Sequence, residues 1–333
     1  MMTIAKGFLA KTPYGKISIF PLRFICFTCL YLMISISACA DTTAPVLTID
    51  GVSLASTEPY ISIDPESGHW EYVDKELSVS IIRHSDQIDK KNVTWYETEI
   101  ECSEQAKLTS LLTTHGKVKG HSFCSPDELA DLYDVVLAFN DDFYASRWYN
   151  KKAQGIIIRN GEIMSDKTFK NDANAFPPLE VLALFEDGSM RTFKSKEHTA
   201  KEYLDMGVTD TYAFGPILVR EGELGERMTD KNYSPYREPR CALGMIEPNH
   251  YIVLTVEGRT NESKGVRLRW LADKMLELGA IEALNLDGGN TTYLIFMGEI
   301  INLPKEIQKG RLRRVGSLIG VGVGKNVSTE PAK

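Results

Sequence analysis

The stretch that decides the fold is ALNLDGGNTT, residues 283–292. An apolar run arrives at Leu286, then Asp287 and two glycines follow, and three small polar residues precede the next apolar run. Consecutive glycines let the backbone come close to a ligand, and Asp287 stands at the end of a predicted strand. The same residues also fit a plain Asp-Gly hairpin turn, so this stretch alone leaves both interpretations open.

Apolar runs typical of strands recur on both sides of this stretch, from residue 77 to residue 323. Several are paired across turn signals such as Asn160-Gly161 and Asp187-Gly188, which predicts antiparallel hairpins. Apolar residues at helical spacing predict a helix over 265–278, and Ser125-Pro126 is a typical helix start. The pattern predicts one α+β domain with a large, mainly antiparallel or mixed sheet system and a few packed helices.

Charge separates the first 40 residues from the rest. Residues 1–40 hold four basic side chains and no acidic one, which leaves 34 basic and 45 acidic residues, a formal charge of −11. The uncharged run at 24–36 is shorter than the roughly 20 residues that span a bilayer, which favours a signal peptide. Its end fits cleavage after Ala40 and also resembles a bacterial lipobox with a lipid-bearing Cys39. We therefore expect an exported, extracytoplasmic protein that meets a membrane only through its signal or a lipid anchor.

The remaining boundaries follow from composition. Residues 41–75 are rich in Thr, Ser and Pro and are expected to form a spacer or an edge segment. The folded domain is expected over 76–325, with a tail at 326–333. The acidic balance and the scattered basic residues exclude a nucleic-acid partner.

Three cysteines remain outside the leader: Cys102, Cys124 and Cys241. An odd number allows at most one internal disulfide, for which Cys102 with Cys124 is the favoured pair, and three reduced thiols are the alternative. The six histidines are scattered and no Cys/His cluster has zinc spacing, so no structural zinc site is expected.

Charged residues stand at three predicted strand ends. Arg240 begins one strand, Glu257 and Arg259 follow another, and Asp287 follows a third. Two guanidinium groups suit a phosphate diester, which they grip through paired N–H donors. Two carboxylates suit proton transfer or attack at an acetal carbon.

In chain order the informative segments are Arg240-Cys241-Ala242-Leu243-Gly244, Glu257-Gly258-Arg259, Leu278-Gly279-Ala280 and residues 285–292. This ordered set resembles the phosphodiester glycosidases, and the likeness runs from about residue 77 to 324. Two further segments are similar to family strands: Phe139-Asn140-Asp141-Asp142-Phe143-Tyr144 and Arg313-Arg314-Val315. The resemblance implies hydrolysis of a sugar-1-phosphodiester at the anomeric C–O bond, so the expected partner is a carbohydrate phosphodiester.

The resemblance and the charges together give expected roles. Asp287 and Glu257 are the expected catalytic residues, one as acid/base and the other attacking or stabilising the sugar centre. The expected substrate-binding residues are Arg240, Arg259, Asn140, Asp141, Asn285, Gly288, Gly289, Asn290, Thr291 and Arg313. The chain departs from the family at Asp141 and Asp142, where glycines are usual, and at Cys241 and Asn290.

Two other functions stay open on the sequence. The first is a metal-dependent phosphodiesterase that breaks a P–O bond, with Asp141, Asp142 and Asp287 as ligands of a hard cation. The second is a non-catalytic protein that binds envelope polysaccharide. No cofactor is expected for the glycosidase, although a divalent cation is left open.

Overall fold

The structure is a computed structural model that describes residues 48–49, 52–53, 58–113, 123–142, 154–167, 176–230, 233–304 and 312–325. The expected leader and the tail lie outside these residues, as do Phe143 and Tyr144. None of the helices described is both long enough and apolar enough to cross a membrane.

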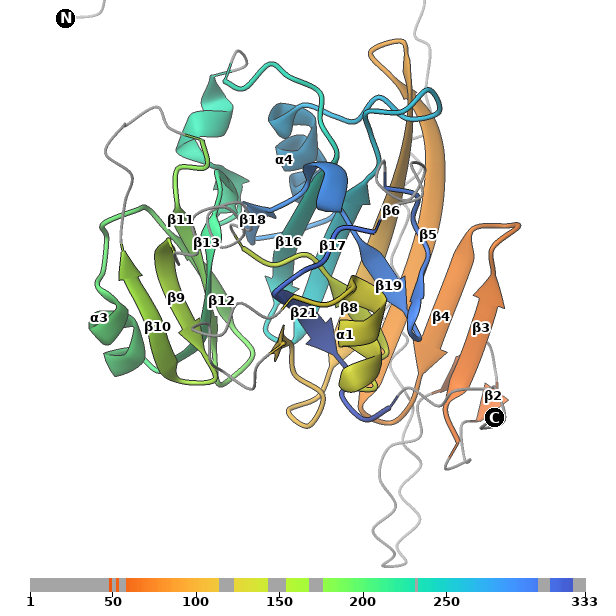
Figure 1. Ribbon diagram of the computed structural model, residues 1–333, viewed down its shortest axis with the longest axis horizontal. Helices are drawn as coiled ribbons and strands as arrows, with labels where there is room; N and C mark the ends of the chain where they lie inside the picture. Colours follow the sequence, from red (N-terminus) through yellow and green to blue (C-terminus); the bar gives the residue numbers. More distant parts are fainter. Residues whose placement is uncertain are drawn as a thin grey trace, which may run out of the picture. The chain divides into compact units, whose positions relative to one another are not determined.

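One sheet of the described residues has nine strands, all paired antiparallel (Figure 1). In spatial order its strands are β15 (Glu223–Leu224), β14 (Ile217–Arg220), β18 (Glu282–Leu286), β16 (Arg240–Glu247), β17 (His250–Val256), β6 (Lys91–Cys102), β5 (Leu77–Ile88), β4 (His69–Val73) and β3 (Tyr60–Asp64). Strands β3 and β4 come from the segment that was expected to be a spacer or an edge. Because Trp70 and Tyr72 are buried in the core, residues 60–73 form the edge of the sheet and not a tether.

Two five-stranded sheets and a short hairpin complete the strands. The first consists of β10 (Glu162–Lys167), β9 (Gly155–Arg159), β13 (Val208–Phe214), β11 (Glu180–Phe185) and β12 (Met190–Phe193). The second consists of β20 (Glu299–Ile300), β19 (Leu294–Phe296), β8 (Leu137–Phe139), β21 (Ser317–Val321) and β7 (Thr109–Leu112). Strands β1 (Thr48–Ile49) and β2 (Val52–Ser53) pair with each other as a two-stranded sheet.

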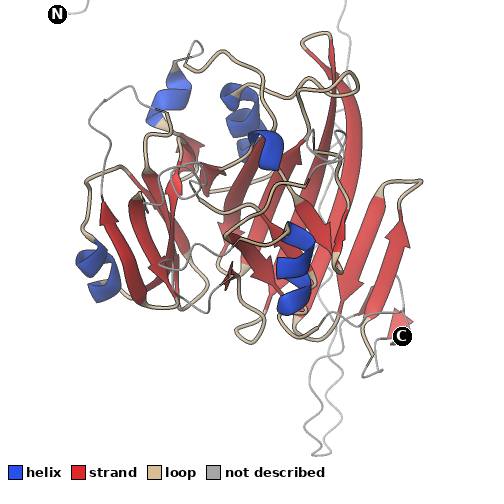
Figure 2. Ribbon diagram, viewed as in Figure 1, coloured by secondary structure: helices blue, strands red, loops and turns tan. Residues whose placement is uncertain are grey.

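Helices are few, as Figure 2 shows. In the described residues they are α1 (Pro126–Leu132), α3 (Ala200–Asp205) and α4 (Leu268–Glu277), with 3-10 turns at Glu226–Thr229 and Gly289–Thr291. Helix α1 begins after Ser125 as predicted, and the Glu128 side chain accepts the Ser125 N–H at 3.0 Å. The α+β prediction, with antiparallel sheets and a few helices, is confirmed.

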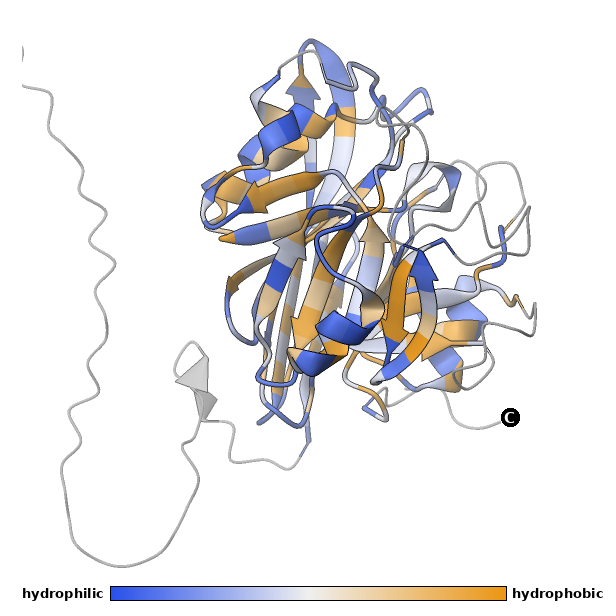
Figure 3. Ribbon diagram, turned by 90° about the vertical axis from the view of Figure 1, so that its left-hand side faces the viewer, coloured by the Kyte–Doolittle hydropathy of each residue, from blue (hydrophilic) through white to orange (hydrophobic). Residues whose placement is uncertain are grey.

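The main core forms where the three large sheets meet. Strand alternation turns Ile100 and Tyr251 of the nine-stranded sheet to one side, where they join Phe139 and Tyr212 from the two five-stranded sheets. Helix α4 covers part of the other face of the nine-stranded sheet, packing apolar side chains such as Leu271 against it. In Figure 3 the apolar residues accordingly follow the strands, and polar residues gather on turns.

A buried ion-pair network joins two of these sheets. Arg159, at the end of β9, is 2% exposed, and its Nη2 lies 2.8 Å from Oδ2 of Asp142, which follows β8 and is fully buried. The neighbouring Asp141 carboxylate lies 3.5 Å from the same nitrogen and accepts a hydrogen bond from Ser317. The guanidinium also stacks on Tyr212, 4.6 Å from the ring centre. Asp141 and Asp142 therefore compensate the charge of a buried arginine.

Replacing Asp142 by Asn is expected to destabilise the fold by about 3 kcal/mol, because it leaves the Arg159 charge poorly compensated in the core. Urea unfolding of the two proteins measures the difference. The matched control is Asp205→Asn, which breaks an exposed pair with Lys201 on α3 and should cost below about 1 kcal/mol. Equal small losses in both variants would contradict a structural role for the buried pair.

Candidate active site

A cleft of about 600 Å³ opens where β16 begins and β18 ends, near the turn that follows β17. This volume is in the usual range for small-molecule sites. Its described lining contains eight of the residues predicted from sequence to bind or react: Arg240, Arg259, Asp287, Gly288, Gly289, Asn290, Thr291 and Arg313. The other described lining residues are Phe176, Phe214, Tyr233, Ser234, Pro235, Tyr236, Glu238, Pro239 and Leu286.

Asp287, Gly288 and Gly289 form a turn that lines the cleft. The Asp287 N–H donates to the Asp141 carbonyl at 3.1 Å, which fixes the aspartate at the end of β18. A Cβ on Gly288 would lie 2.9 Å from the Pro239 carbonyl oxygen, so a larger residue would push the two segments apart. The N–H groups of Gly288 and Gly289 donate to Asp287 Oδ1 at 2.9 Å and to the Pro239 carbonyl at 3.1 Å. Both N–H groups are therefore used by hydrogen bonds within this part of the fold.

Arg240 is the most unusual charge in the cleft. The residue is 5% exposed, and its Nε has no hydrogen-bond partner among the described residues. Its Nη2 makes one long contact of 3.4 Å with the Tyr236 carbonyl. Burial lowers the pKa of Arg240 to about 10. The cleft therefore contains a buried cation whose charge is not neutralised by an ion pair within the part of the chain described.

Arg259 is held on two sides. Its Nε lies 2.5 Å from Oε2 of Glu238, and its Nη1 donates to Oδ1 of Asn290 at 2.8 Å. The backbone of Arg259 has φ of 62°, in the left-handed region that non-glycine residues rarely adopt. Such a conformation persists only where the surroundings fix it, which is common at functional sites.

Glu257 lies on the other face of the sheet from Arg240. Arg240 pairs with Val256 and so shares its face, whereas the next residue, Glu257, points the opposite way. Its Oε1 accepts hydrogen bonds from the Tyr96 hydroxyl at 3.1 Å and the Leu303 N–H at 2.8 Å. The structure does not place Glu257 among the described residues that line the cleft.

The burial of Glu257 predicts a pH effect on stability. Burial raises the pKa of this carboxyl, so the folded state holds the proton more tightly than the unfolded state does. The associated stability is present at pH below the ordinary glutamate value near 4.3 and is lost as pH rises through the folded pKa. We expect Glu257→Gln to remove this loss of stability. The free energy of unfolding of the variant, measured in urea, should therefore rise relative to that of the wild type between about pH 4.5 and 7. A wild type that loses no stability relative to the variant over this range would contradict the assignment.

Several other predicted binding residues serve the fold. The Asn140 side chain donates to the Thr291 carbonyl and accepts the Tyr293 N–H at 2.7 Å, and Asn285 donates to the Gly215 carbonyl at 2.9 Å. Neither Asn140 nor Asn285 lines the cleft in the part of the chain described, and Asp141 belongs to the Arg159 network. The Thr291 hydroxyl, which does line the cleft, donates to the Gly288 carbonyl at 3.0 Å.

Sequence reasoning missed the aromatic wall of the cleft and its acidic neighbour Glu238. Phe176, Tyr233 and Tyr236 come from two polar loops, and Tyr236 is 72% exposed. Aromatic residues within otherwise polar loops were the signal that could have identified this wall, because such residues often contact ligands.

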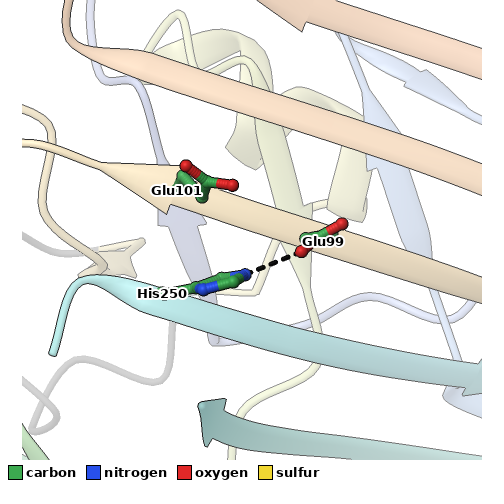
Figure 4. Close-up of side chains that lie close together, drawn as sticks. All are labelled: Glu99, Glu101 and His250. Carbon is green, nitrogen blue, oxygen red and sulfur yellow. Dashed lines mark hydrogen bonds and ion pairs between the residues drawn. The ribbon is translucent and has the colours of Figure 1, made fainter. Parts of the chain in front are cut away.

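The structure weakens the metal-site alternative at Asp141, Asp142 and Asp287. The Arg159 guanidinium already contacts the first two carboxylates, and its charge would repel a cation there. Elsewhere, Glu99 and Glu101 of β6 and His250 of β17 have ligand atoms within 4.8 Å of one another (Figure 4). This group lies at the end of β17 away from Glu257, and the 2.7 Å contact between Glu99 and His250 accounts for it as a surface hydrogen bond.

The expected disulfide does not form. Cys102, Cys124 and Cys241 are all free thiols, because Cys102 ends β6 while Cys124 pairs with Val315 beside a different sheet. Cys241 is fully buried, and burial raises the pKa of its thiol to about 12. The residue is therefore a packing residue of the core and not a nucleophile.

Comparison with known proteins supports the family resemblance. The model of the phosphodiester glycosidase family matches residues 133–322. The chain belongs to this family. The fold is similar to the zebrafish N-acetylglucosamine-1-phosphodiester alpha-N-acetylglucosaminidase catalytic domain auto-inhibited by its pro-peptide, with a TM-score of 0.61 and 16% identity over 75% of this chain and 84% of that one.

Two further relatives have no assigned activity. A hypothetical protein from Synechocystis has a TM-score of 0.52 and 14% identity, covering 75% of this chain and 62% of that one. The SPbeta prophage-derived uncharacterized protein YomE of Bacillus subtilis is 29% identical over 169 residues. That match covers 50% of this chain but only 25% of YomE.

Proposed function

We propose that this protein hydrolyses a sugar-1-phosphodiester of cell-envelope or extracellular glycans at the anomeric C–O bond. The observation that carries the proposal is Arg240, a buried guanidinium without an ion-pair partner among the described residues, in a wall shared with Asp287. A buried unpaired charge costs several kcal/mol, so an anionic ligand that neutralises it gains binding energy.

A phosphate diester fits the remaining cations. Guanidinium groups grip phosphate oxygens through parallel N–H donors, and Arg259 and Arg313 line the same cleft as Arg240. Arg259 is oriented by Glu238 and Asn290, which reduces the entropy lost when a ligand binds. As the glycosidic bond breaks, these arginines would neutralise the charge of the departing phosphomonoester.

Asp287 is the carboxylate that we assign to the reaction. It would either take a proton from the water that attacks the anomeric carbon or attack that carbon itself. In both cases the bond from the anomeric carbon to the phosphate oxygen breaks, and the bonding electrons leave with the phosphate. Glu257, which faces the other way, is assigned to positioning of the segment around Leu303.

The aromatic wall supports a ring-shaped substrate. Phe176 and Tyr236 expose large aromatic faces beside the arginines, and sugar rings place their C–H faces on such surfaces. A cleft with cations on one side and aromatics on the other suits a molecule in which a sugar adjoins a phosphate.

Product analysis tests the proposal. The purified protein is incubated with N-acetylglucosamine-1-phosphodiesters and with teichoic-acid-like fragments, and the products are identified by mass spectrometry and NMR. Free sugar with a phosphomonoester supports the proposal. Sugar-1-phosphate would instead indicate P–O cleavage, and binding without any product would indicate a polysaccharide-binding protein.

A further inference from the structure

We propose that Arg237 is a positioning residue, which holds the segment 236–239 in the geometry that binds the substrate. Tyr236, Glu238 and Pro239 of this segment line the cleft, whereas Arg237 is absent from the described lining. Arg237 would therefore act through its neighbours and not by touching the substrate. This inference rests on the proposed function, because the segment lies beside the arginines that we assign to the phosphate.

The Arg237 side chain joins this segment to two others. Its Nη1 donates to the Gly265 carbonyl at 2.9 Å, in the connection between β17 and α4. Its Nη2 donates to the Ile88 carbonyl at 2.9 Å and lies 2.5 Å from Oδ2 of Asp89, at the tip of the β5–β6 hairpin. The Arg237 side chain is only 16% exposed. Three contacts fix its guanidinium, because the donors of this group lie in one rigid plane.

The hairpin tip reaches the segment because β5 and β6 continue past their neighbours in the sheet (Figure 1). The pairing of β4 with β5 ends at Ile82, and the pairing of β17 with β6 ends at Trp95. Beyond these points the connection between β17 and α4 runs beside the hairpin, where the Lys264 N–H donates to the Asn92 carbonyl at 2.9 Å. The hairpin tip, this connection and the segment 236–239 therefore form one hydrogen-bonded unit.

The backbone next to Arg237 is held at the same junction. Glu238 exchanges two hydrogen bonds of 3.1 Å with Val266. A Cβ on Gly265 would lie 2.4 Å from the Glu238 carbonyl oxygen, so only glycine lets the two segments approach this closely. The Glu238 carboxylate in turn lies 2.5 Å from Nε of Arg259. A shift of this junction would therefore move a guanidinium that we assign to the phosphate.

Loss of the Arg237 contacts should act on affinity. Without them the segment 236–239 would move more freely before a ligand binds. Binding would then have to order it, and the free-energy cost of that ordering is subtracted from the affinity. A residue that only stabilised the fold would change the free energy of unfolding and leave the dissociation constant of the folded protein unchanged.

The test measures ligand binding and local mobility in the same proteins. Dissociation constants for dimethyl phosphate are measured by ligand-observed NMR, and amide hydrogen exchange is followed at Glu238 and Val266. We expect Arg237→Gln to weaken binding of dimethyl phosphate about tenfold. We expect the same variant to speed exchange at both amides by about tenfold, because the junction opens locally more often.

The hairpin side of the contact makes the test specific. Asp89→Ala removes the ion pair from a mostly exposed residue, and we expect it to weaken binding about threefold. The double variant should bind no more weakly than Arg237→Gln alone, because both changes break one contact. The matched control is Arg220→Gln, which breaks a two-contact pair with Glu197 outside the described lining of the cleft. Its dissociation constant should stay within about twofold of the wild-type value.

Wild-type affinity or wild-type exchange in Arg237→Gln overturns the inference. Losses of affinity that add fully in the double variant also overturn it. If Arg237→Gln fails to fold, Asp89→Ala decides, and wild-type affinity and exchange in that variant count against the inference. A wild type that binds no dimethyl phosphate counts instead against the proposed function. The exchange comparison needs no ligand, so it then decides whether Arg237 fixes the segment.

Discussion

Replacing Asp287 by Asn is expected to lower kcat by on the order of 10²- to 10⁴-fold, with a much smaller change in KM. The physical reason is that Asn cannot accept a proton or attack carbon, while its side-chain oxygen still accepts the Gly288 N–H that now bonds to Asp287 at 2.9 Å. The turn should therefore keep its shape. Steady-state kinetics on a sugar-1-phosphodiester, with urea unfolding of the same protein, measure both effects.

The matched control is Asp273→Asn on the exposed face of α4, where the aspartate pairs with Arg269. Its kcat should stay within about twofold of the wild-type value, since exposed ion pairs contribute little to stability. Turnover by Asp287→Asn near that of the control would remove Asp287 from the reaction. Glu257→Gln is a second comparison. Because Glu257 lies on the opposite face of the sheet, its replacement should lower kcat far less than replacement of Asp287 does.

The predicted residues that the structure brings together in the cleft lie next to strand ends. Arg240 and Asp287 were predicted together because each follows or begins a buried run, and neighbouring strands bring such ends together. Glu257 is absent from the described lining of the cleft, and no single apolar run shows why. Its side depends on the pairing of Arg240 with Val256, and a shift of one residue turns a side chain to the opposite face.

Burial of polar residues was the second thing that the sequence could not supply. Asn140 and Asn285 stand beside the site in the chain, but their amides bond to the carbonyls of Thr291 and Gly215 in the interior. The burial of Arg159 could not be predicted from the sequence either, since an arginine beside a turn is normally solvent-exposed. Only the packing of two sheets shows that Asp142 neutralises it.

Net charge gives little information about the ligand. Beyond residue 40 the chain has a formal charge of −11, which would repel an anionic diester at long range. Screening limits such repulsion to roughly 10 Å in physiological salt, whereas a cation in direct contact acts at full strength in a poorly solvated cleft. Affinity for phosphate must therefore come from the local arginines, and above all from the one that is buried.

Replacing that arginine should separate stability from function. We expect Arg240→Met to weaken binding of the diester at least 100-fold, as removal of a charged hydrogen-bonding partner does. The same change should raise the free energy of unfolding by about 1–3 kcal/mol, because it removes a 5% exposed cation that has no ion-pair partner in the described structure and adds an apolar side chain of similar length. Binding is measured by calorimetry with a diester, and stability by urea unfolding without ligand.

The two measurements together distinguish a binding residue from a structural one. A structural arginine would lose stability when replaced, whereas one retained for a ligand gains stability and loses affinity. Arg191→Met, at an exposed position on β12, is the matched control and should change neither quantity appreciably. Arg240→Lys should recover little of the affinity, because an ammonium group cannot reproduce the paired N–H donors of a guanidinium. A destabilised Arg240→Met protein that still binds the diester would show that Arg240 supports the fold and that the phosphate is held elsewhere.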